Sequence, residues 1–370
     1  MIPGVAAALL VMFGGFALAD ALGHAILAIR GLPDAASPIS GVPVAIVLGL
    51  LLHNLVGLPA FLEPGLRFST TTILRLGIVL VGIRLSLGDV VRLGIGGVPV
   101  VVAAITAGLL FVTWFNRRLG LPPRLGILIA AGTSICGVTA IVSTAPAIHA
   151  DEREVAYAVA NVVAFGLLGM LFYPYFAHAM LPGPTQIGLF LGTAVHDTSQ
   201  VVGAALSYKQ LYGDDLVLRV ATVTKLTRNL FLAAVIPALT WWHLRSTDAA
   251  GTGGARPVAR PWTSYVPPFV LGFVAMVVVR SLGNLTLDRG GEAFGLWDSV
   301  EWARITSVIG DTLASQYLLG TAMAGVGLST SFSVFKGVGP RPFIVGFMGA
   351  LFVGAIGLTM ALVFGRFVQL

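Results

Sequence analysis

The feature that most constrains the fold of this chain is a succession of long apolar blocks separated by short polar loops. A transmembrane helix needs about 20 predominantly apolar residues, and most of these blocks approach that length. With 56% hydrophobic and 10% charged residues, the chain has too few charged side chains for a soluble protein, in which about 25% of residues are charged. The blocks lie at about 2–19, 41–57, 68–87, 95–115, 124–148, 154–177, 185–207, 216–243, 263–283, 304–330 and 341–367. The sequence therefore predicts an all-α, polytopic transmembrane helix bundle of 9–11 spans, with residues 1–370 forming a single domain.

Two of the blocks are interrupted by small and polar residues. Residues 132–139 read GTSICGVT, and residues 192–203, sixty positions later (192 − 132), read GTAVHDTSQVVG. Polar groups are costly in hydrocarbon unless they line a site, and paired interruptions of apolar segments are typical of broken helices around a transport site. We therefore predict that the helices at 124–148 and 185–207 are interrupted, and that the two breaks lie close together.

An internal repeat relates the third and tenth blocks. Residues 68–115 and 311–367 are similar at one offset, 243 (320 − 77). The identities are Gly77, Gly82, Leu85, Ser86, Gly94, Gly96 and Pro99 with Gly320, Gly325, Leu328, Ser329, Gly337, Gly339 and Pro342. An odd number of crossings separates the two copies if every block between them spans the membrane. The repeat is then inverted, as in many transporters, and residues 68–99 and 311–342 should superpose after inversion.

The interruptions supply candidate substrate-binding groups. A break exposes main-chain N–H groups at a half-helix N-terminus, where the helix dipole favours an anion, and hydroxyl groups such as that of Thr139 add donors. His196 and Asp197 are the candidates for carrying a coupled proton. In the structural alternative, His196 caps carbonyl groups freed by the break and Asp197 pairs with a nearby Lys or Arg.

A third cluster lies in the block at 216–243. Lys225, Arg228 and Asn229 are three and four residues apart, so they share one face of a helix. This face is interpreted as a cationic wall for an anionic substrate, with a salt bridge to Asp197 or snorkelling at the helix end as the alternatives. The candidate substrate-binding residues are therefore Thr133, Ser134, Cys136, Gly137, His196, Asp197, Thr198, Ser199, Gln200, Lys225, Arg228 and Asn229.

Other polar residues are expected to have structural roles. Arg84 lies near the end of its block and is expected at the membrane interface, whereas Arg75 is expected to be more buried and to pair with a carboxylate. Asp311 and Gln316 are expected to be structural, and the Gly- and Pro-containing stretch 246–262 is expected to be a flexible loop.

Several functional classes lack their sequence signatures. The chain has no Walker A sequence, which argues against an ATP-driven pump, and no H-E-x-x-H or comparable metal-ligand spacing. Cys136 is its single cysteine, so no intramolecular disulfide is possible, and no basic run exceeds Arg117-Arg118, which argues against nucleic-acid binding. We therefore expect no cofactor, no metal site and no catalytic residue.

The stretches 76–85, 132–137, 195–202 and 225–228 together resemble the YeiH family, whose members are described as sulfate exporters of the bacterial inner membrane. The resemblance covers nearly the whole chain. It implies inverted repeats, interrupted helices and an elevator-like motion, since the family is similar to the cation/proton antiporter and bile-acid symporter group. Where relatives carry Glu, this chain has Asp197, which keeps the carboxylate but shortens its reach.

The sequence thus predicts a multi-pass secondary transporter of the bacterial inner membrane. The expected substrate is a small anion, sulfate or a related sulfur oxyanion, with proton coupling through His196 or Asp197. The alternatives are a cation/proton antiporter that uses Asp197, with Lys225 as the competing charge, and an intramembrane enzyme that uses Cys136 or His196. The expected partners are the anionic substrate and the lipid bilayer, with a homodimer left open and nucleic acid not expected.

Overall fold

The computed structural model describes residues 1–29, 39–248, 267–332 and 339–368, and helices dominate this part of the chain. Each predicted apolar block overlaps a helical segment, and six of the described segments are long and apolar enough to cross a bilayer. The all-α, polytopic bundle is therefore confirmed. The predicted flexible loop 246–262 begins inside a helix that ends at Asp248, and its residues from 249 onward lie outside the described residues.

The uninterrupted blocks form single helices or continuous helical segments. The single helices are α1 (Ile2–Ile29), α2 (Gly41–Leu51, extended by η1, Leu52–Val56), α5 (Leu87–Arg118), α8 (Glu152–Met180), α13 (Pro268–Gly290) and α16 (Pro340–Phe364). Like η1, two further segments contain π-helical turns, which are often found at functional sites. They are α3 (Glu63–Phe68), η3 (Ser69–Ile73), α4 (Leu74–Val81) and η4 (Gly82–Arg84), and α14 (Ser299–Ser307), η7 (Val308–Leu319) and α15 (Gly320–Ser329).

The remaining segments are each divided into two helices. Both predicted interruptions are present, between α6 (Pro123–Ser134) and α7 (Val138–Thr144) and between α9 (Pro184–Ala194) and α10 (Thr198–Tyr212). The block at 216–243 forms α11 (Asp215–Leu230) and α12 (Leu232–Asp248).

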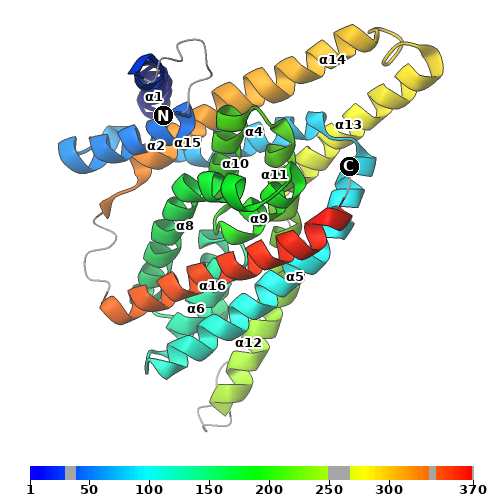
Figure 1. Ribbon diagram of the computed structural model, residues 1–370. Helices are drawn as coiled ribbons and strands as arrows, with labels where there is room; N and C mark the ends of the chain where they lie inside the picture. The colour runs from blue at the N-terminus through cyan, green and yellow to red at the C-terminus, as the bar shows by residue number, and fades with distance from the viewer. Residues whose placement is uncertain (30–38, 249–266, 333–338, 369–370) are drawn as a thin grey trace.

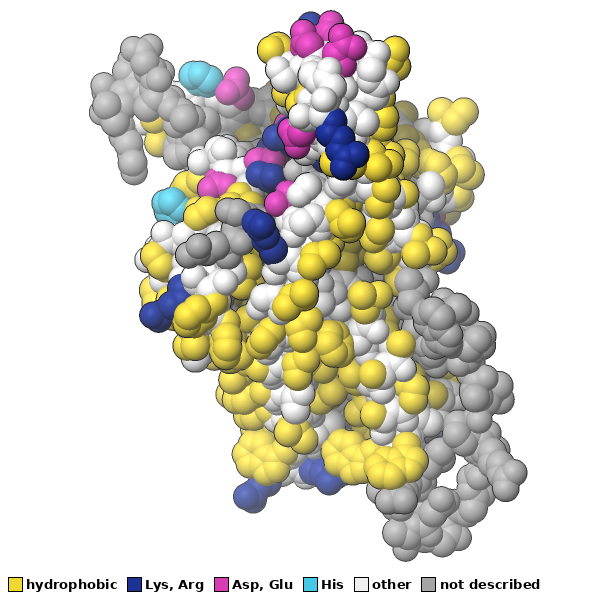
Figure 2. Space-filling model, turned by 90° about the vertical axis from the view of Figure 1, so that its right-hand side faces the viewer, with side chains coloured by type: hydrophobic (Ala, Val, Ile, Leu, Met, Phe, Trp, Pro, Cys, Tyr) yellow, Lys and Arg dark blue, Asp and Glu magenta, His cyan; other side chains and the backbone are white. Residues whose placement is uncertain are grey.

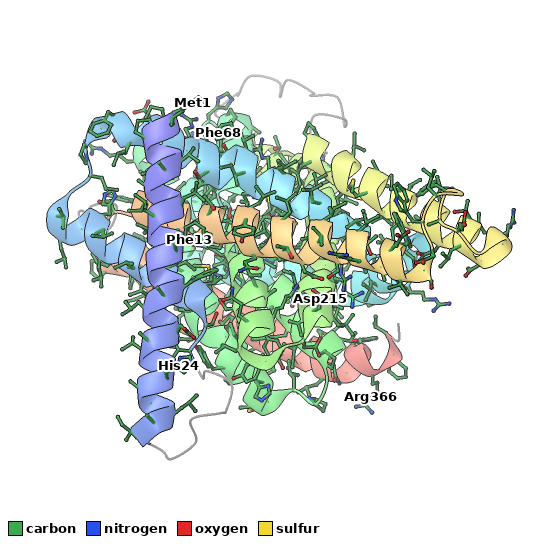
Figure 3. The ribbon with its side chains drawn as sticks, turned by 90° about the horizontal axis from the view of Figure 1, so that it is seen from above. Met1, Phe13, His24, Phe68, Asp215 and Arg366 are labelled. Atoms are coloured by element: carbon green, nitrogen blue, oxygen red, sulfur yellow. The ribbon has the colours of Figure 1, made fainter. Side chains whose placement is uncertain are left out.

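The helices form two layers (Figure 1). The first layer consists of α1–α4 and α13–α15, and the second layer consists of α5–α12 and α16. Seen from above, α1 runs along one edge of the bundle with Met1 and His24 toward its two ends (Figure 3). On the face shown in Figure 2, hydrophobic side chains form a broad continuous surface, while many charged side chains lie toward its upper end. Such an apolar outer surface is what a bilayer solvates.

Each layer contains an antiparallel helix pair made from the two similar sequence segments. In the first layer, Gly77 of α4 packs against Leu319 of η7, while Arg84 lies beside Gly310. In the second layer, the rings of Phe111 of α5 and Phe352 of α16 stack with centroids 4.1 Å apart. Gly108 packs against Val353 there, and Gly349 packs against Val112. In both pairs, the residue numbers of the two side chains in contact at the crossing differ by about 243. This difference equals the offset of the sequence repeat.

Small residues allow the helices of the first layer to approach closely. Gly49 of α2 faces α15, and a Cβ atom added there would lie 2.8 Å from the main-chain nitrogen of Leu328. Gly14 of α1 is less crowded, because a Cβ atom there would lie 3.7 Å from Leu48 Cδ2, an ordinary contact distance.

We expect Gly49→Ala to destabilise the protein by about 1–3 kcal/mol, the usual cost of overpacking a close contact. The matched change Gly14→Ala should be neutral or stabilising by about 0.5–1 kcal/mol, because alanine restricts the unfolded chain more than glycine does. Thermal unfolding of the two purified variants in detergent measures the difference. Equal melting temperatures would contradict the close approach of α2 to α15.

Candidate functional site

The two helix breaks meet inside the second layer. Ile135, Cys136 and Gly137 separate α6 from α7, and residues 195–197 separate α9 from α10. Gly137 has φ +73°, a conformation that side chains other than glycine rarely adopt, and a Cβ atom on it would lie 2.8 Å from Asp197 Oδ2. Glycine is therefore what allows the first break to lie against the carboxylate of the second.

Asp197 caps the second half-helix. Its Oδ1 accepts hydrogen bonds from the Ser199 main-chain nitrogen at 2.9 Å and from Ser199 Oγ at 2.7 Å. The main-chain nitrogen of Asp197 donates to Gln200 Oε1 at 3.1 Å, which completes a capping box. Gln200 also donates from Nε2 to the carbonyl of Val163 at 3.2 Å, so its side chain ties the break to α8.

Arg228 satisfies the carbonyl groups at the ends of α6 and α9. Its guanidinium donates to Ser134 O at 2.7 Å through Nε and to Thr133 O at 2.7 Å through Nη2. Through Nη1 it donates to Thr193 O at 2.6 Å and to Val195 O at 3.2 Å. One fully buried side chain of α11 therefore binds both half-helices where their internal hydrogen bonding ends.

Lys225 does the same one turn earlier on α11. Its Nζ donates to Ile135 O at 3.0 Å, to Val195 O at 3.4 Å and to His196 O. Lys225 is also fully buried. The donors of both cations thus point at main-chain oxygens of the breaks, and not at Asp197 as the salt-bridge alternative required.

A cavity of about 250 Å³ lies between the two layers beside the breaks. From the second layer it is lined by Cys136, Thr139, Asp197, Thr198, Ser199, Asn229 and Leu232. From the first layer it is lined by Thr70, Thr71, Leu74, Arg75, Ile78 and Phe269, with Pro267 just before α13. Because Thr139 lies in the first turn of α7 and Thr198 and Ser199 in the first turn of α10, the amino ends of both half-helices border this cavity.

Five of the candidate residues from the sequence line this cavity. They are Cys136, Asp197, Thr198, Ser199 and Asn229. Gly137 lies against Asp197 as described, whereas the remaining candidates are buried outside the lining: Thr133, Ser134, His196, Gln200, Lys225 and Arg228. Asn229 donates from Nδ2 to Thr198 Oγ1 at 3.3 Å.

Three polar atoms near the breaks are buried without a hydrogen-bond partner among the described residues. They are Ser134 Oγ, His196 Nδ1 and Asn229 Oδ1. His196 and Cys136 share no hydrogen bond in the described part of the chain, and only Cys136 lines the cavity.

Arg75 corrects an expectation from the sequence. It was expected to be more buried than Arg84, but it is exposed and its guanidinium carbon lies 6.0 Å from the ring centroid of Phe269. The side chain of Arg84 is 25% exposed and lies 3.5 Å from both Asp215 and Asp311. The order was reversed because a 3₁₀ turn, Gly82–Arg84, ends the helix and directs Arg84 between the layers.

The candidate residues from the sequence do not include the hydroxyl groups of the first layer. Thr70 and Thr71 line the cavity and belong to a run of four hydroxyl residues, 69–72, inside an apolar block. Their hydroxyl groups also donate to main-chain carbonyls within the helix, Thr71 to Arg67 at 2.6 Å. The run was the available signal, since hydroxyl side chains recur at intramembrane polar sites.

We expect Arg228→Met to lower the melting temperature strongly and to reduce the yield of folded protein. The change leaves the buried carbonyls of Thr133, Ser134 and Thr193 without donors, and each costs about 1–3 kcal/mol. The matched change Arg92→Met, at an exposed position of α5, should leave the melting temperature within a few degrees. An Arg228→Met protein as stable as the Arg92→Met protein would contradict the structural role.

Comparison with known proteins gives the family. The family model described as conserved hypothetical protein 698 matches residues 14–346. A UPF0324 membrane protein of Corynebacterium glutamicum is 33% identical over 323 residues, covering 87% of this chain and 85% of the relative. A UPF0324 membrane protein of Bordetella bronchiseptica is 33% identical over 308 residues, covering 82% and 87%.

Among solved structures, a sodium/proton antiporter of Methanocaldococcus jannaschii gives a TM-score of 0.22 at 13% identity, over 96% of this chain and 99% of the other. A score this low does not indicate a shared fold. The family assignment rests on the sequence matches, which agree with the resemblance of the interrupted segments. The chain therefore belongs to the family of conserved hypothetical protein 698, the YeiH-type UPF0324 membrane proteins.

Proposed function

We propose that this protein is a secondary transporter of the bacterial inner membrane that carries a small oxyanion through the cavity beside the two helix breaks. Sulfate or a related sulfur oxyanion is the first candidate, on the strength of the family resemblance. The proposal rests on the different surroundings of the carbonyl ends and the amino ends of the broken helices. The carbonyl ends of α6 and α9 are covered by Lys225 and Arg228, whereas the amino ends of α7 and α10 border the cavity.

This division favours an anion over a cation. Main-chain carbonyls are the usual ligands of cations at broken helices, and here buried cationic side chains occupy them. An amino end carries a partial positive charge of roughly half an elementary charge. Hydroxyl groups of Thr139 and Thr198 add donors of the kind that bind oxyanions.

The lining of the cavity includes one positively charged and one negatively charged side chain. Among the described lining residues, Arg75 carries the guanidinium and Asp197 the carboxylate. Arg75 lies on the first layer, across the cavity from the breaks, where it would bind an oxyanion from the opposite side. Asp197 would repel a bound oxyanion unless it is protonated, so it is the candidate for the coupled proton. His196 stays a weaker candidate, because it is buried outside the lining.

The antiparallel pairs support an inverted repeat as the architecture of the transporter. A twofold axis in the membrane plane relates two copies of a helix as antiparallel neighbours that cross at equivalent positions. The α4–η7 and α5–α16 pairs cross where the residue numbers differ by about 243, which is the offset of the sequence repeat.

Cation/proton antiport is the second candidate, and two oxygen atoms favour it. The carboxylate of Asp197 lines the cavity, and Asn229 Oδ1 is buried without a partner among the described residues. A carboxylate oxygen and an amide oxygen at one cavity are suitable ligands for a small hard cation. The two candidate functions predict different effects of removing the Asp197 charge on ligand binding.

We expect Asp197→Asn to increase the affinity of the purified protein for sulfate, because asparagine removes the repulsion and still caps a helix well. If the substrate is a cation, the same change should abolish the thermal stabilisation by sodium or lithium chloride. Melting temperatures measured in sulfate, phosphate and alkali chlorides, with wild type and variant side by side, separate these outcomes. Stabilisation by alkali cations that disappears in the variant would overturn the oxyanion proposal.

We expect Arg75→Gln to weaken sulfate binding about 10- to 100-fold, the range for losing a charged hydrogen bond of about 1.5–3 kcal/mol. Uptake of radiolabelled sulfate into proteoliposomes under an imposed pH gradient should fall with it. The control Arg304→Gln removes an exposed guanidinium from α14, outside the cavity lining, and should keep uptake near the wild-type rate. Equal uptake by the two variants would remove Arg75 from the proposed site.

A further inference from the structure

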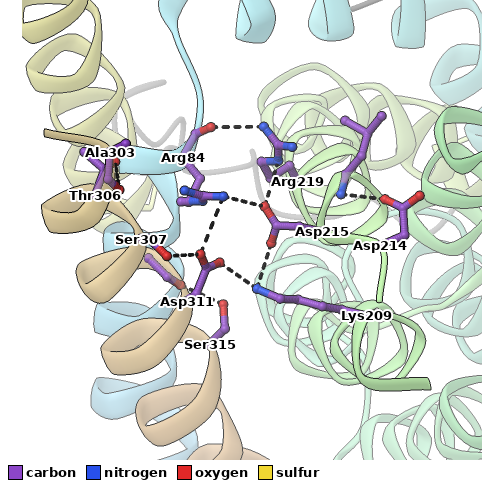
Figure 4. Close-up of polar contacts among 12 residues, drawn as sticks. Arg84, Lys209, Asp214, Asp215, Arg219, Ala303, Thr306, Ser307, Asp311 and Ser315 are labelled. Carbon is purple, nitrogen blue, oxygen red and sulfur yellow. Dashed lines mark hydrogen bonds and ion pairs between the residues drawn. The ribbon is translucent and has the colours of Figure 1, made fainter. Parts of the chain in front are cut away.

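A cluster of five charged residues joins the two layers (Figure 4). Lys209 Nζ lies 2.8 Å from Asp215 Oδ1 and 2.7 Å from Asp311 Oδ1. Arg84 Nη2 lies 3.5 Å from Oδ2 of the same two carboxylates. Arg219 Nε lies 3.1 Å from Asp215 Oδ2, and its Nη1 donates to the carbonyl of Arg84 at 3.1 Å.

The members of this cluster come from different layers. Arg84 ends the α3–α4 segment and Asp311 lies in η7, both in the first layer. Lys209 lies near the end of α10, and Asp215 and Arg219 lie in the first turns of α11, in the second layer. Seen from above, Asp215 lies toward the middle of the molecule and not at its edge (Figure 3). Of the ion pairs described, those of Arg84 with Asp215 and of Lys209 with Asp311 therefore cross between the layers.

The cluster lies at the opposite end of α10 from the binding cavity. Ser199 lines that cavity at the start of α10, and Lys209 follows ten residues later, which is roughly 15 Å along a helix. Lys209 and Asp311 line a second cavity, of about 700 Å³, which also lies between the layers. The stretch of α10 between the two cavities is apolar and buried, as Val202 and Ala205 show.

We infer that this ionic cluster is the gate at the far end of the transport path, and that the 700 Å³ cavity is the vestibule beyond it. The inference rests on the proposed function, since a gate implies a path from the cavity at the breaks. In this arrangement the cluster fixes the relative position of the layers, and its opening lets the second layer shift against the first. The binding cavity then becomes continuous with the vestibule.

The composition of the cluster suits a gate that opens. The side chains are 19–27% exposed, so they are neither fully desolvated nor freely solvated. Three cations share two carboxylates, and Arg84 Nε is buried without a hydrogen-bond partner among the described residues. Asp311 is carried by π-helical turns, which are frequent at functional sites.

The single cysteine of the chain provides a test that needs no substrate. Cys136 lines the binding cavity and is 2% exposed. Its alkylation by N-ethylmaleimide, in the full-length protein in detergent, measures how often the cavity opens. We expect Asp311→Asn and Lys209→Gln each to raise the alkylation rate about tenfold. Each change removes one partner of an ion pair that favours the closed arrangement of the layers over the open one.

The double variant distinguishes a gate from general loosening. Since both changes break one contact, the double variant should react no faster than either single variant, and all three should keep melting temperatures close to wild type. The control Glu292→Gln, at an exposed position just after α13, should react at the wild-type rate.

Three outcomes decide the matter. An unchanged alkylation rate in both single variants would overturn the gate, and so would rates that multiply in the double variant while the melting temperature falls. If the wild-type protein does not bind sulfate, but the variants show the expected alkylation rates, the proposed substrate is overturned and the gate is supported.

Discussion

The structure depends on the hydrogen bonds that two side chains of α11 make to the ends of two broken helices. A helix can break at membrane depth only where the freed main-chain groups are buried in protein or line a cavity. Arg228 and Lys225 provide the donors for the carbonyls of residues 133–135, 193, 195 and 196. The helix that carries them packs tightly, because Gly188 and Gly192 bring α9 against Val220 and Thr224 of α11.

The positive and negative side chains at the breaks lie at opposite helix ends. Cations neutralise the carbonyl ends and are buried, while the carboxylate of Asp197 lies at the amino ends and borders the cavity. Lys225 and Arg228, the most prominent positive residues in the sequence, direct their donors at these buried carbonyls. Under the proposed function, the groups that would face a substrate are hydroxyls, the amino ends, Asp197 and the guanidinium of Arg75 from the opposite layer.

The sequence predicted the helical bundle, the two interruptions and the shared face of Lys225 and Arg228, because these follow from local composition and helical period. It could not predict what that face contacts, since the partners are main-chain oxygens whose position depends on how α6 and α9 end. The sequence predicts the burial of Arg75 and Arg84 in the wrong order, because distance from the end of an apolar block does not show where a 3₁₀ turn ends the helix. The ion pair between Lys209 and Asp311 joins residues 102 apart, and no local pattern links them.

The contrast between contacts within and between the layers indicates where this molecule can change shape. Within a layer, small residues and stacked rings fit closely, as at Gly49 or between Phe111 and Phe352, and such packing is lost abruptly when helices slide. Between the layers lie two cavities and a group of ion pairs, whose partners can be exchanged for water at modest cost. The layers also share apolar contacts, such as that of Gly203 of α10 with Met323 of α15, and a relative shift of the layers would have to slide these side chains past one another. Because the helix breaks are held within the second layer by α11, they would move with it as one unit.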